Sequence, residues 1–185
     1  MDNRSMAING RAINNPLHKK IAAFIQFPDC KILKSVECGG TQNIPLFCST
    51  EKGNDTEYCN VDLMILKNER IKVIIEIEES GITPSKICGK FLTSALSSNY
   101  IHESESNQPI DMDESVTFIQ ILDISELKES TSKKEQLSNI EKSIQKIIPV
   151  KDSKIDGYKL FFGNNSDFDK NRLNEVADFI QEVLK

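Results

Sequence analysis

The chain has 185 residues, of which 38% are hydrophobic and 28% are charged, as is usual for a single soluble globular domain. A net charge of −5 argues against a basic protein that coats nucleic acid, although an acidic metal site would itself lower the net charge. No apolar run is long enough to cross a membrane, and residues 1–17 lack the apolar core of a signal peptide, so we expect a cytoplasmic protein.

The first half of the chain predicts one helix followed by a run of strands. Asn15 and Pro16 are residue types favoured at the cap and at the first position of a helix. Pro45 has no backbone N–H group, so its strand is expected at a sheet edge. The expected elements are a helix from Pro16 to about Pro28, a strand over 43–48, a polar loop over 49–57, and strands over 59–67 and 71–79 that the short link KNER joins as a hairpin.

The second half alternates helices and strands, which is typical of an α/β chain with crossover connections. The expected elements are a helix from Thr83-Pro84, an acidic loop over 103–115, a strand over 116–122, a helix over 133–148, a strand over 157–162 and a last helix capped near Asp169. The expected fold class is α/β, with a mixed central sheet (an antiparallel meander, then crossover strands) flanked by helices. We expect one domain over residues 1–185.

Cysteine and histidine provide no competing site. The five cysteines include no CxxC pair, which predicts reduced, mostly buried thiols rather than disulfides or a zinc site. The two histidines, His18 and His102, are far apart in the sequence. A metal site or a catalytic triad based on histidine is therefore not expected.

Two glutamates interrupt the apolar strand 71–79. Glu76 and Glu78 stand at alternate positions, so both project from one face of the strand, while the β-branched residues between them face the core. A hairpin centred on Glu69 sets Asp62 directly opposite Glu76, with Cβ atoms roughly 5 Å apart. A turn centred half a residue away would break this match.

Like charges that face each other across a sheet destabilise it. A divalent cation such as Mg²⁺ relieves this repulsion, because it takes carboxylate oxygens as ligands. The backbone carbonyl of Ile77 is a candidate for a further oxygen ligand. The alternative is that Glu76 and Glu78 are solvated side chains of a half-exposed strand, and that Asp62 only begins its strand.

The order of these residues resembles the PD-(D/E)XK nuclease superfamily, which has the restriction-endonuclease-like fold. Asp62, 13 intervening residues and Glu76-x-Glu78 follow one helix and precede another. The family core of a helix, three antiparallel strands, a helix and a strand corresponds to about 16–122, and 123–185 would be peripheral additions. The resemblance implies a Mg²⁺- or Mn²⁺-dependent DNA endonuclease, such as a type II restriction enzyme, that acts as a homodimer because two strands need two sites.

The resemblance also implies roles for single residues. Asp62 and Glu76 would hold the metal ion, whereas Glu78 stands where most members have lysine. This departure fits an active variant, in which Glu78 orients water, or an inactive descendant that binds nucleic acid or protein. Lys86 and Lys90 lie four residues apart on the next helix and so share a face.

We assign Lys86 to catalysis in place of the missing lysine, and both lysines to phosphate contact. The alternative is that both lysines lie on a solvated helix face. A third hypothesis is a hydrolase based on Asp and Glu that acts on a substrate other than nucleic acid.

Overall fold

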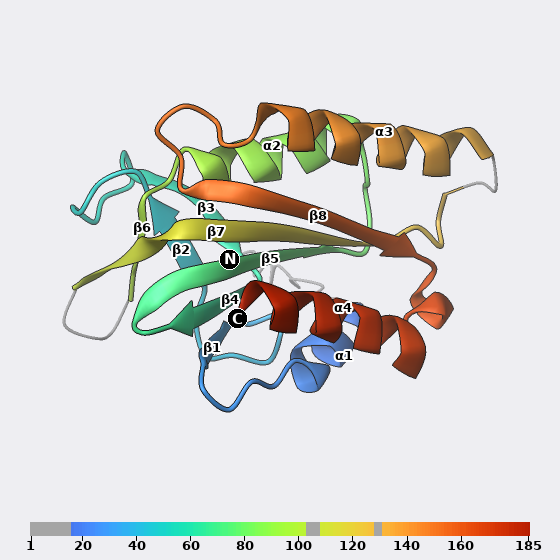
Figure 1. Cartoon of the computed structure of the whole chain (residues 1–185), viewed down its shortest axis with the longest axis horizontal. Coiled ribbons are helices and arrows are strands. Elements are labelled where there is room, and N and C mark those ends of the chain that lie inside the picture. Colours follow the sequence, from blue (N-terminus) through green and yellow to red (C-terminus); the bar gives the residue numbers. More distant parts are fainter. Residues whose placement is uncertain (1–15, 103–107, 128–130) are drawn as a thin grey trace, which may run out of the picture.

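The computed structural model describes residues 16–102, 108–127 and 131–185. Over these residues the chain is an α/β protein with eight strands in one mixed sheet and four α-helices (Figure 1). The elements are α1 (Pro16–Phe24), β1 (Lys31–Lys34), β2 (Ile44–Phe47), β3 (Glu57–Val61), β4 (Leu63–Lys67), β5 (Arg70–Glu78), α2 (Pro84–Ala95), β6 (Asn99–Ile101), β7 (Pro109–Asp123), α3 (Thr131–Ile147), β8 (Ile155–Gly163), the 3₁₀-helix η1 (Asn165–Asp167) and α4 (Lys170–Val183). None of the helices within these ranges has the length and apolar character that a bilayer span requires.

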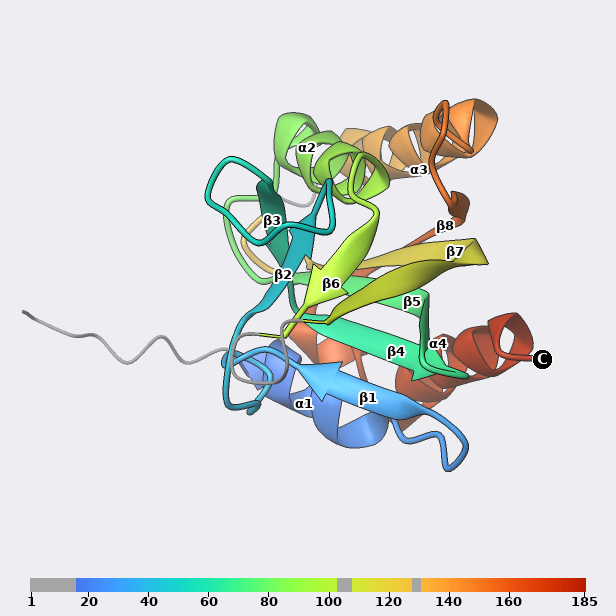
Figure 2. The ribbon, with the colours of Figure 1, turned by 90° about the vertical axis from the view of Figure 1, so that its left-hand side faces the viewer.

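The sheet has two arms that share the long strand β7. The strand order is β1-β4-β5-β7-β6-β2-β3, and β8 also pairs with β7. The main arm holds β1, β4, β5, β8 and the second half of β7, which runs parallel to β5 and β8. The small arm holds β3, β2, β6 and residues 109–111 of β7, all paired antiparallel (Figure 2). One residue, Asp62, separates β3 of the small arm from β4 of the main arm.

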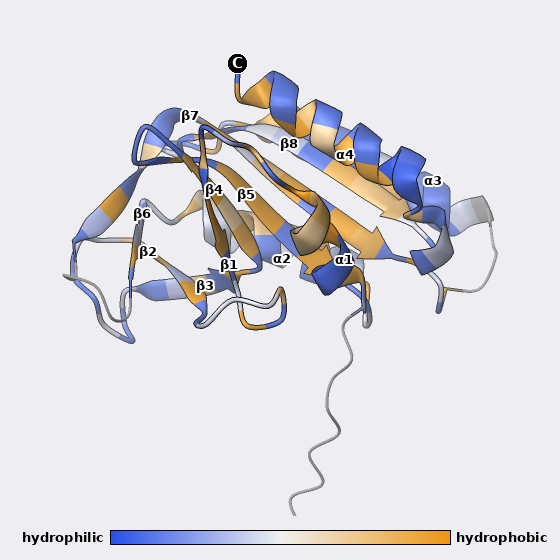
Figure 3. Cartoon of the chain, turned by 90° about the horizontal axis from the view of Figure 1, so that it is seen from below, coloured by the Kyte–Doolittle hydropathy of each residue, from blue (hydrophilic) through white to orange (hydrophobic). Residues whose placement is uncertain are grey.

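Helices cover both faces of the main arm, which gives the protein two hydrophobic cores. Helices α2 and α3 lie on one face, and α1 and α4 lie on the other (Figures 1 and 2). In Figure 3 the strands beneath α4 are largely apolar, while α4 alternates between polar and apolar colours, as an amphipathic helix does. Strand β5 contributes to both cores, with Ile74 on the α2 side and Ile75 on the α1 side. The prediction that only one face of this strand meets a core is therefore wrong.

The hairpin of β4 and β5 has the register that sets Asp62 opposite Glu76. Leu63 pairs with Ile75, and the amide of Asp62 donates to the carbonyl of Ile75 at 3.3 Å. The turn itself is centred half a residue away from Glu69, between Asn68 and Glu69, both of which have positive φ. A β-bulge between residues 65 and 66 compensates for this offset.

Several predicted elements differ from the structure. Strand β2 is an inner strand, so Pro45 does not mark an edge; its missing N–H group is tolerated because β6 pairs only with Leu46 and Phe47. An antiparallel meander would place β2 next to the hairpin of β4 and β5. Strand β1, which was not predicted, pairs with β4 there instead. The predicted strand over 59–67 is two strands that belong to different arms. Residues 109–115 of the predicted acidic loop are part of β7, whereas 103–107 and the predicted cap Asn15 lie outside the described residues.

Candidate functional site

Asp62 and Glu76 lie side by side where the hairpin meets the small arm. Glu76 is fully buried, and the side chain of Asp62 is 15% exposed. The carboxylate oxygen Oδ2 of Asp62 accepts a hydrogen bond of 2.7 Å from the backbone amide of Ile77. That bond ties the residue between the two arms to the strand that carries Glu76.

The two glutamates of β5 pair with two lysines of α2. Lys90 Nζ lies 3.1 Å from Glu76 Oε2, and Lys86 Nζ lies 2.5 Å from Glu78 Oε2. Two residues of strand span roughly 6.6 Å and four residues of helix span about 6 Å, so the two spacings match. Helix α2 thus runs antiparallel over β5 and places one lysine over each glutamate. We call these two ion pairs the ladder.

A histidine and a third glutamate complete the cluster. His18, near the start of α1, has its Nε2 atom 3.6 Å from Asp62 Oδ2 and its Nδ1 atom 2.7 Å from Glu79 Oε1. The same oxygen of Glu79 accepts the backbone amides of Leu17 and His18 at 3.0 Å. These two amides are among the first N–H groups of α1, which have no partner within the helix. Glu79 therefore joins the end of β5 to the start of α1.

Burial and neighbouring charges shift the pKa values of these groups in different directions. Burial and the negative charge of Asp62 raise the pKa of Glu76 well above its usual range. Burial opposes ionisation of Asp62 too, but the nearby His18 ring and the hydrogen bond from the amide of Ile77 outweigh it and lower the pKa of Asp62. Burial alone would lower the pKa of His18, yet Asp62 and Glu79 raise it. Lys90, despite its burial, has a raised pKa because Glu76 and the other carboxylates stabilise its charge.

Each of the two central carboxylates has one oxygen that is engaged with the protein. Glu76 Oε2 bonds to Lys90, while its Oε1 is buried and accepts no hydrogen bond from any described residue. On the neighbouring strand β7, Gln120 stands opposite Glu76, and its buried Nε2 has no acceptor within the described part of the chain. The contacts of Asp62 with Ile77 and His18 both fall on Oδ2. Chemically, Glu76 Oε1 and Asp62 Oδ1 are hard oxygen donors that fit a Mg²⁺ or Mn²⁺ ion.

The site's fit to a metal ion, however, does not go beyond these two carboxylates. Among the described residues, no group of three or more His, Cys, Asp and Glu side chains is arranged to hold a metal ion. Glu78 is engaged by Lys86 and Glu79 by His18. A carbonyl ligand from Ile77 stays a prediction.

The structure brings some of the predicted site residues together and separates others. Asp62, Glu76 and Lys90 form one group, whereas Glu78 and Lys86 form a pair one step along the ladder. Lys86 also donates to the carbonyl of Ser80, so Lys90 rather than Lys86 is the lysine nearest the two central carboxylates.

Sequence reasoning missed His18 and Glu79. They are 61 residues apart, and no local pattern links them. One indication was present: the first amides of a helix that begins at Pro16 need hydrogen-bond acceptors from outside the helix, and Glu79 provides one.

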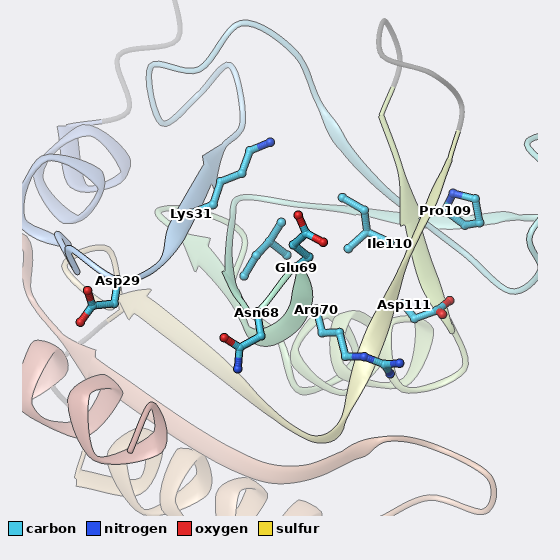
Figure 4. Close-up of a pocket in the computed structure, with 9 residues that line it drawn as sticks. Asp29, Lys31, Asn68, Glu69, Arg70, Pro109, Ile110 and Asp111 are labelled. Carbon is cyan, nitrogen blue, oxygen red and sulfur yellow. The ribbon is translucent and has the colours of Figure 1, made fainter.

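A separate open hollow lies at the turn end of the same hairpin (Figure 4). Its lining mixes acidic and basic side chains, among them Asp29, Lys31, Glu69 and Arg70. None of the predicted site residues lines it, so we place the candidate site at the opposite end of the hairpin. Comparisons of the chain with protein-family models, with curated proteins and with solved structures yield no significant match.

Proposed function

We propose that the protein is a metal-dependent nuclease that hydrolyses phosphodiester bonds in DNA and has a restriction-endonuclease-like core. The observation that carries this proposal is the pair of adjacent carboxylates, Asp62 and Glu76, with the unpartnered oxygen of Glu76 buried beside Asp62. The order of α1, the antiparallel strands β1, β4 and β5, then α2 and a strand parallel to β5 supports it. This is the order of elements that the resemblance to PD-(D/E)XK nucleases implies.

The residues of the site have distinct roles in the proposed reaction. A bound Mg²⁺ would polarise a phosphoryl oxygen and activate water. Asp62 and Glu76 would hold the ion, and the amide of Ile77 keeps Asp62 oriented toward Glu76. Lys90 takes the role first assigned to Lys86, because it is within 3.1 Å of Glu76 and its side chain is 33% exposed. From there its ammonium group balances the charge of the scissile phosphate.

Cleavage of a supercoiled plasmid tests the proposal directly. The wild type with Mg²⁺ or Mn²⁺ should nick or linearise the plasmid. Glu76→Gln and Asp62→Asn should each reduce the rate by more than about 100-fold, since even partners outside the ligand shell cost 10–100-fold. Glu114→Gln is the matched control, because Glu114 is exposed and pairs with Lys154 away from the site. If that control loses as much activity as the site variants, the assignment of the site is wrong. Linearisation in one event would support a homodimer.

A second candidate is a binding module without catalysis, and the ladder favours it. Lys90 and Lys86 neutralise Glu76 and Glu78 without any metal ion. Calorimetric titration with Mn²⁺ separates the two functions. A nuclease site predicts binding by the wild type that Glu76→Gln abolishes. No heat of binding, together with retention of a labelled DNA duplex, would support the binding module instead.

A further inference from the structure

His18 touches the candidate metal site from a different part of the chain. Its ring spans the space between Asp62 on one side and Glu79 on the other, and it is buried. The ring nitrogens have separate partners: Nε2 faces Asp62 at 3.6 Å and Nδ1 contacts Glu79 at 2.7 Å. The two nitrogens can therefore be tested one at a time.

The contact with Asp62 falls on one of its two carboxylate oxygens. Both His18 Nε2 and the amide of Ile77 approach the same atom, Oδ2 of Asp62. Together they restrict rotation of the carboxylate without using its other oxygen. A ligand carboxylate that is held on one oxygen in this way presents the other in a fixed direction, as partners of metal ligands commonly arrange.

The contact with Glu79 fixes the histidine itself. Glu79 Oε1 accepts from the ring and from the amides of Leu17 and His18, so it holds both the backbone and the side chain of His18. Glu79 follows directly after Glu78, the last residue of β5. The position of the ring is thus set by the strand that also carries Glu76.

We propose that His18 is a positioning residue, which Glu79 holds in place and which orients Asp62 for binding a divalent cation. This inference rests on the proposed metal-dependent function. It adds a residue from α1 to a site that the sequence pattern restricted to the hairpin and α2. His18 acts through Asp62 and does not itself bind the cation.

Two substitutions separate the two sides of the ring. In His18→Asn the amide nitrogen occupies about the place of Nδ1, so the contact with Glu79 is kept and the contact with Asp62 is lost. In His18→Gln the amide nitrogen occupies about the place of Nε2, so the contact with Asp62 is kept and the contact with Glu79 is lost. Each variant is measured twice: by calorimetric titration with Mn²⁺, and by thermal unfolding without metal.

The proposal predicts opposite profiles. His18→Asn should unfold within about 2 °C of the wild type, yet bind Mn²⁺ at least about tenfold more weakly. His18→Gln should unfold about 2–4 °C lower, but bind Mn²⁺ within about threefold of the wild type. His102, which follows β6 and lies against Tyr100, is the control histidine, and His102→Gln should leave the Mn²⁺ affinity unchanged.

The remaining outcomes overturn the inference in distinguishable ways. If His18→Asn binds Mn²⁺ as the wild type does, His18 does not position Asp62, and the proposed function stands. If affinity falls in both variants in proportion to stability, the role of His18 is structural only. If the wild type binds no Mn²⁺, the proposed function fails and the role of His18 fails with it.

Discussion

Glu76 is an acid that the fold removes from water and places beside a second acid. Its pKa is raised first by burial and then by Asp62, against the attraction of Lys90. A raised pKa means that the folded state binds the proton more tightly than the unfolded state. The stability that this proton contributes is lost as the pH rises from about 4.5 through the pKa of the folded state.

We therefore expect Glu76→Gln to be more stable than the wild type at pH 8 when no metal is present. The gain is about 1.4 kcal/mol in the free energy of unfolding for each unit by which the pKa is raised. At pH 4 the two proteins should be nearly equal, because Glu76 is then protonated in both states. Urea unfolding at both pH values measures the difference. A less stable variant at pH 8 would show that the attraction of Lys90 outweighs the burial of Glu76.

At the scale of residues, the sequence contained part of the site. The alternation of Glu76 and Glu78 and the length of the hairpin place Asp62 opposite Glu76, and the structure has this register. The bulge that makes it possible has no sign in the sequence. His18 and Glu79 could not be found, because their contact depends on how α1 packs against the end of β5.

At the scale of elements, the ladder joins β5 to α2 through two ion pairs. Its two steps differ mainly in the glutamate: the Glu76 side chain is fully buried, whereas the Glu78 side chain keeps 10% of its surface exposed. Removing the lysine from such a pair leaves an uncompensated charge, at a cost that rises with the burial of that charge. The two lysines are therefore a matched pair for testing.

Lys90→Met should lower the free energy of unfolding at pH 8 by about 2 kcal/mol or more. Lys86→Met should lower it by less, because the Glu78 side chain that it leaves unpaired is 10% exposed, whereas the Glu76 side chain is fully buried. The double variant with Lys90→Met and Glu76→Gln should recover most of the loss. Chemical denaturation of the four proteins measures these values, and equal losses for the two lysines would contradict the difference in burial.

The turn of the hairpin offers a test of backbone strain. Glu69 has a φ of 60°, in the left-handed region that disfavours side chains with a Cβ atom. Glu69→Gly should stabilise the protein by about 1 kcal/mol, since Asn-Gly is the preferred pair for this turn. Gly81, with a φ of 61° and open space around it, provides the reverse control. Gly81→Ala should destabilise by a similar amount, and a gain in thermal stability there would contradict the explanation.

Most of the long elements were predictable, whereas two of the short strands were not. Helices α2, α3 and α4 and strands β5 and β8 were expected close to their observed positions, because their apolar residues repeat at helical or strand spacing. Strands β1 and β6 have four and three residues, too few for a pattern. The break between β3 and β4 at Asp62 could not be predicted, because the residues on both sides of it favour strands. The two strands are separate only because β3 pairs with β2 and β4 pairs with β5.

At the scale of the whole molecule, the inner strands of the sheet differ from its edge strands. Strands β5 and β7 have neighbours on both sides, whereas β1 and β3 are the ends of the strand order. Backbone amides of inner, buried strands exchange only when the whole protein unfolds, but edge strands also open locally.

Hydrogen exchange should therefore be slowest in β5 and in residues 116–123 of β7. Exchange in β1 and β3 should be faster by at least about tenfold, which corresponds to a difference of about 1.4 kcal/mol in opening free energy. Exchange measured by NMR on the metal-free protein resolves these strands. Equal protection across β1 and β5 would show that the main arm opens as one unit.

The α/β class and the mixed, helix-flanked sheet were predictable, and the structure confirms them. The second arm was not predictable. It is built from strands that are distant in the sequence, such as β2 and β6, and pairings of this kind leave no local pattern.

Asp62 is the single residue between a strand of the small arm and a strand of the main arm, while Glu76 belongs to the main arm alone. Two contacts hold Asp62 to the main arm: its amide donates to the carbonyl of Ile75, and its Oδ2 atom accepts from the amide of Ile77. A displacement of the small arm that pulls on Asp62 therefore has to strain these two contacts. Under the proposed function, a nucleic acid that displaces the small arm would change the affinity for the cation, and the cation would change the affinity for the nucleic acid by the same factor.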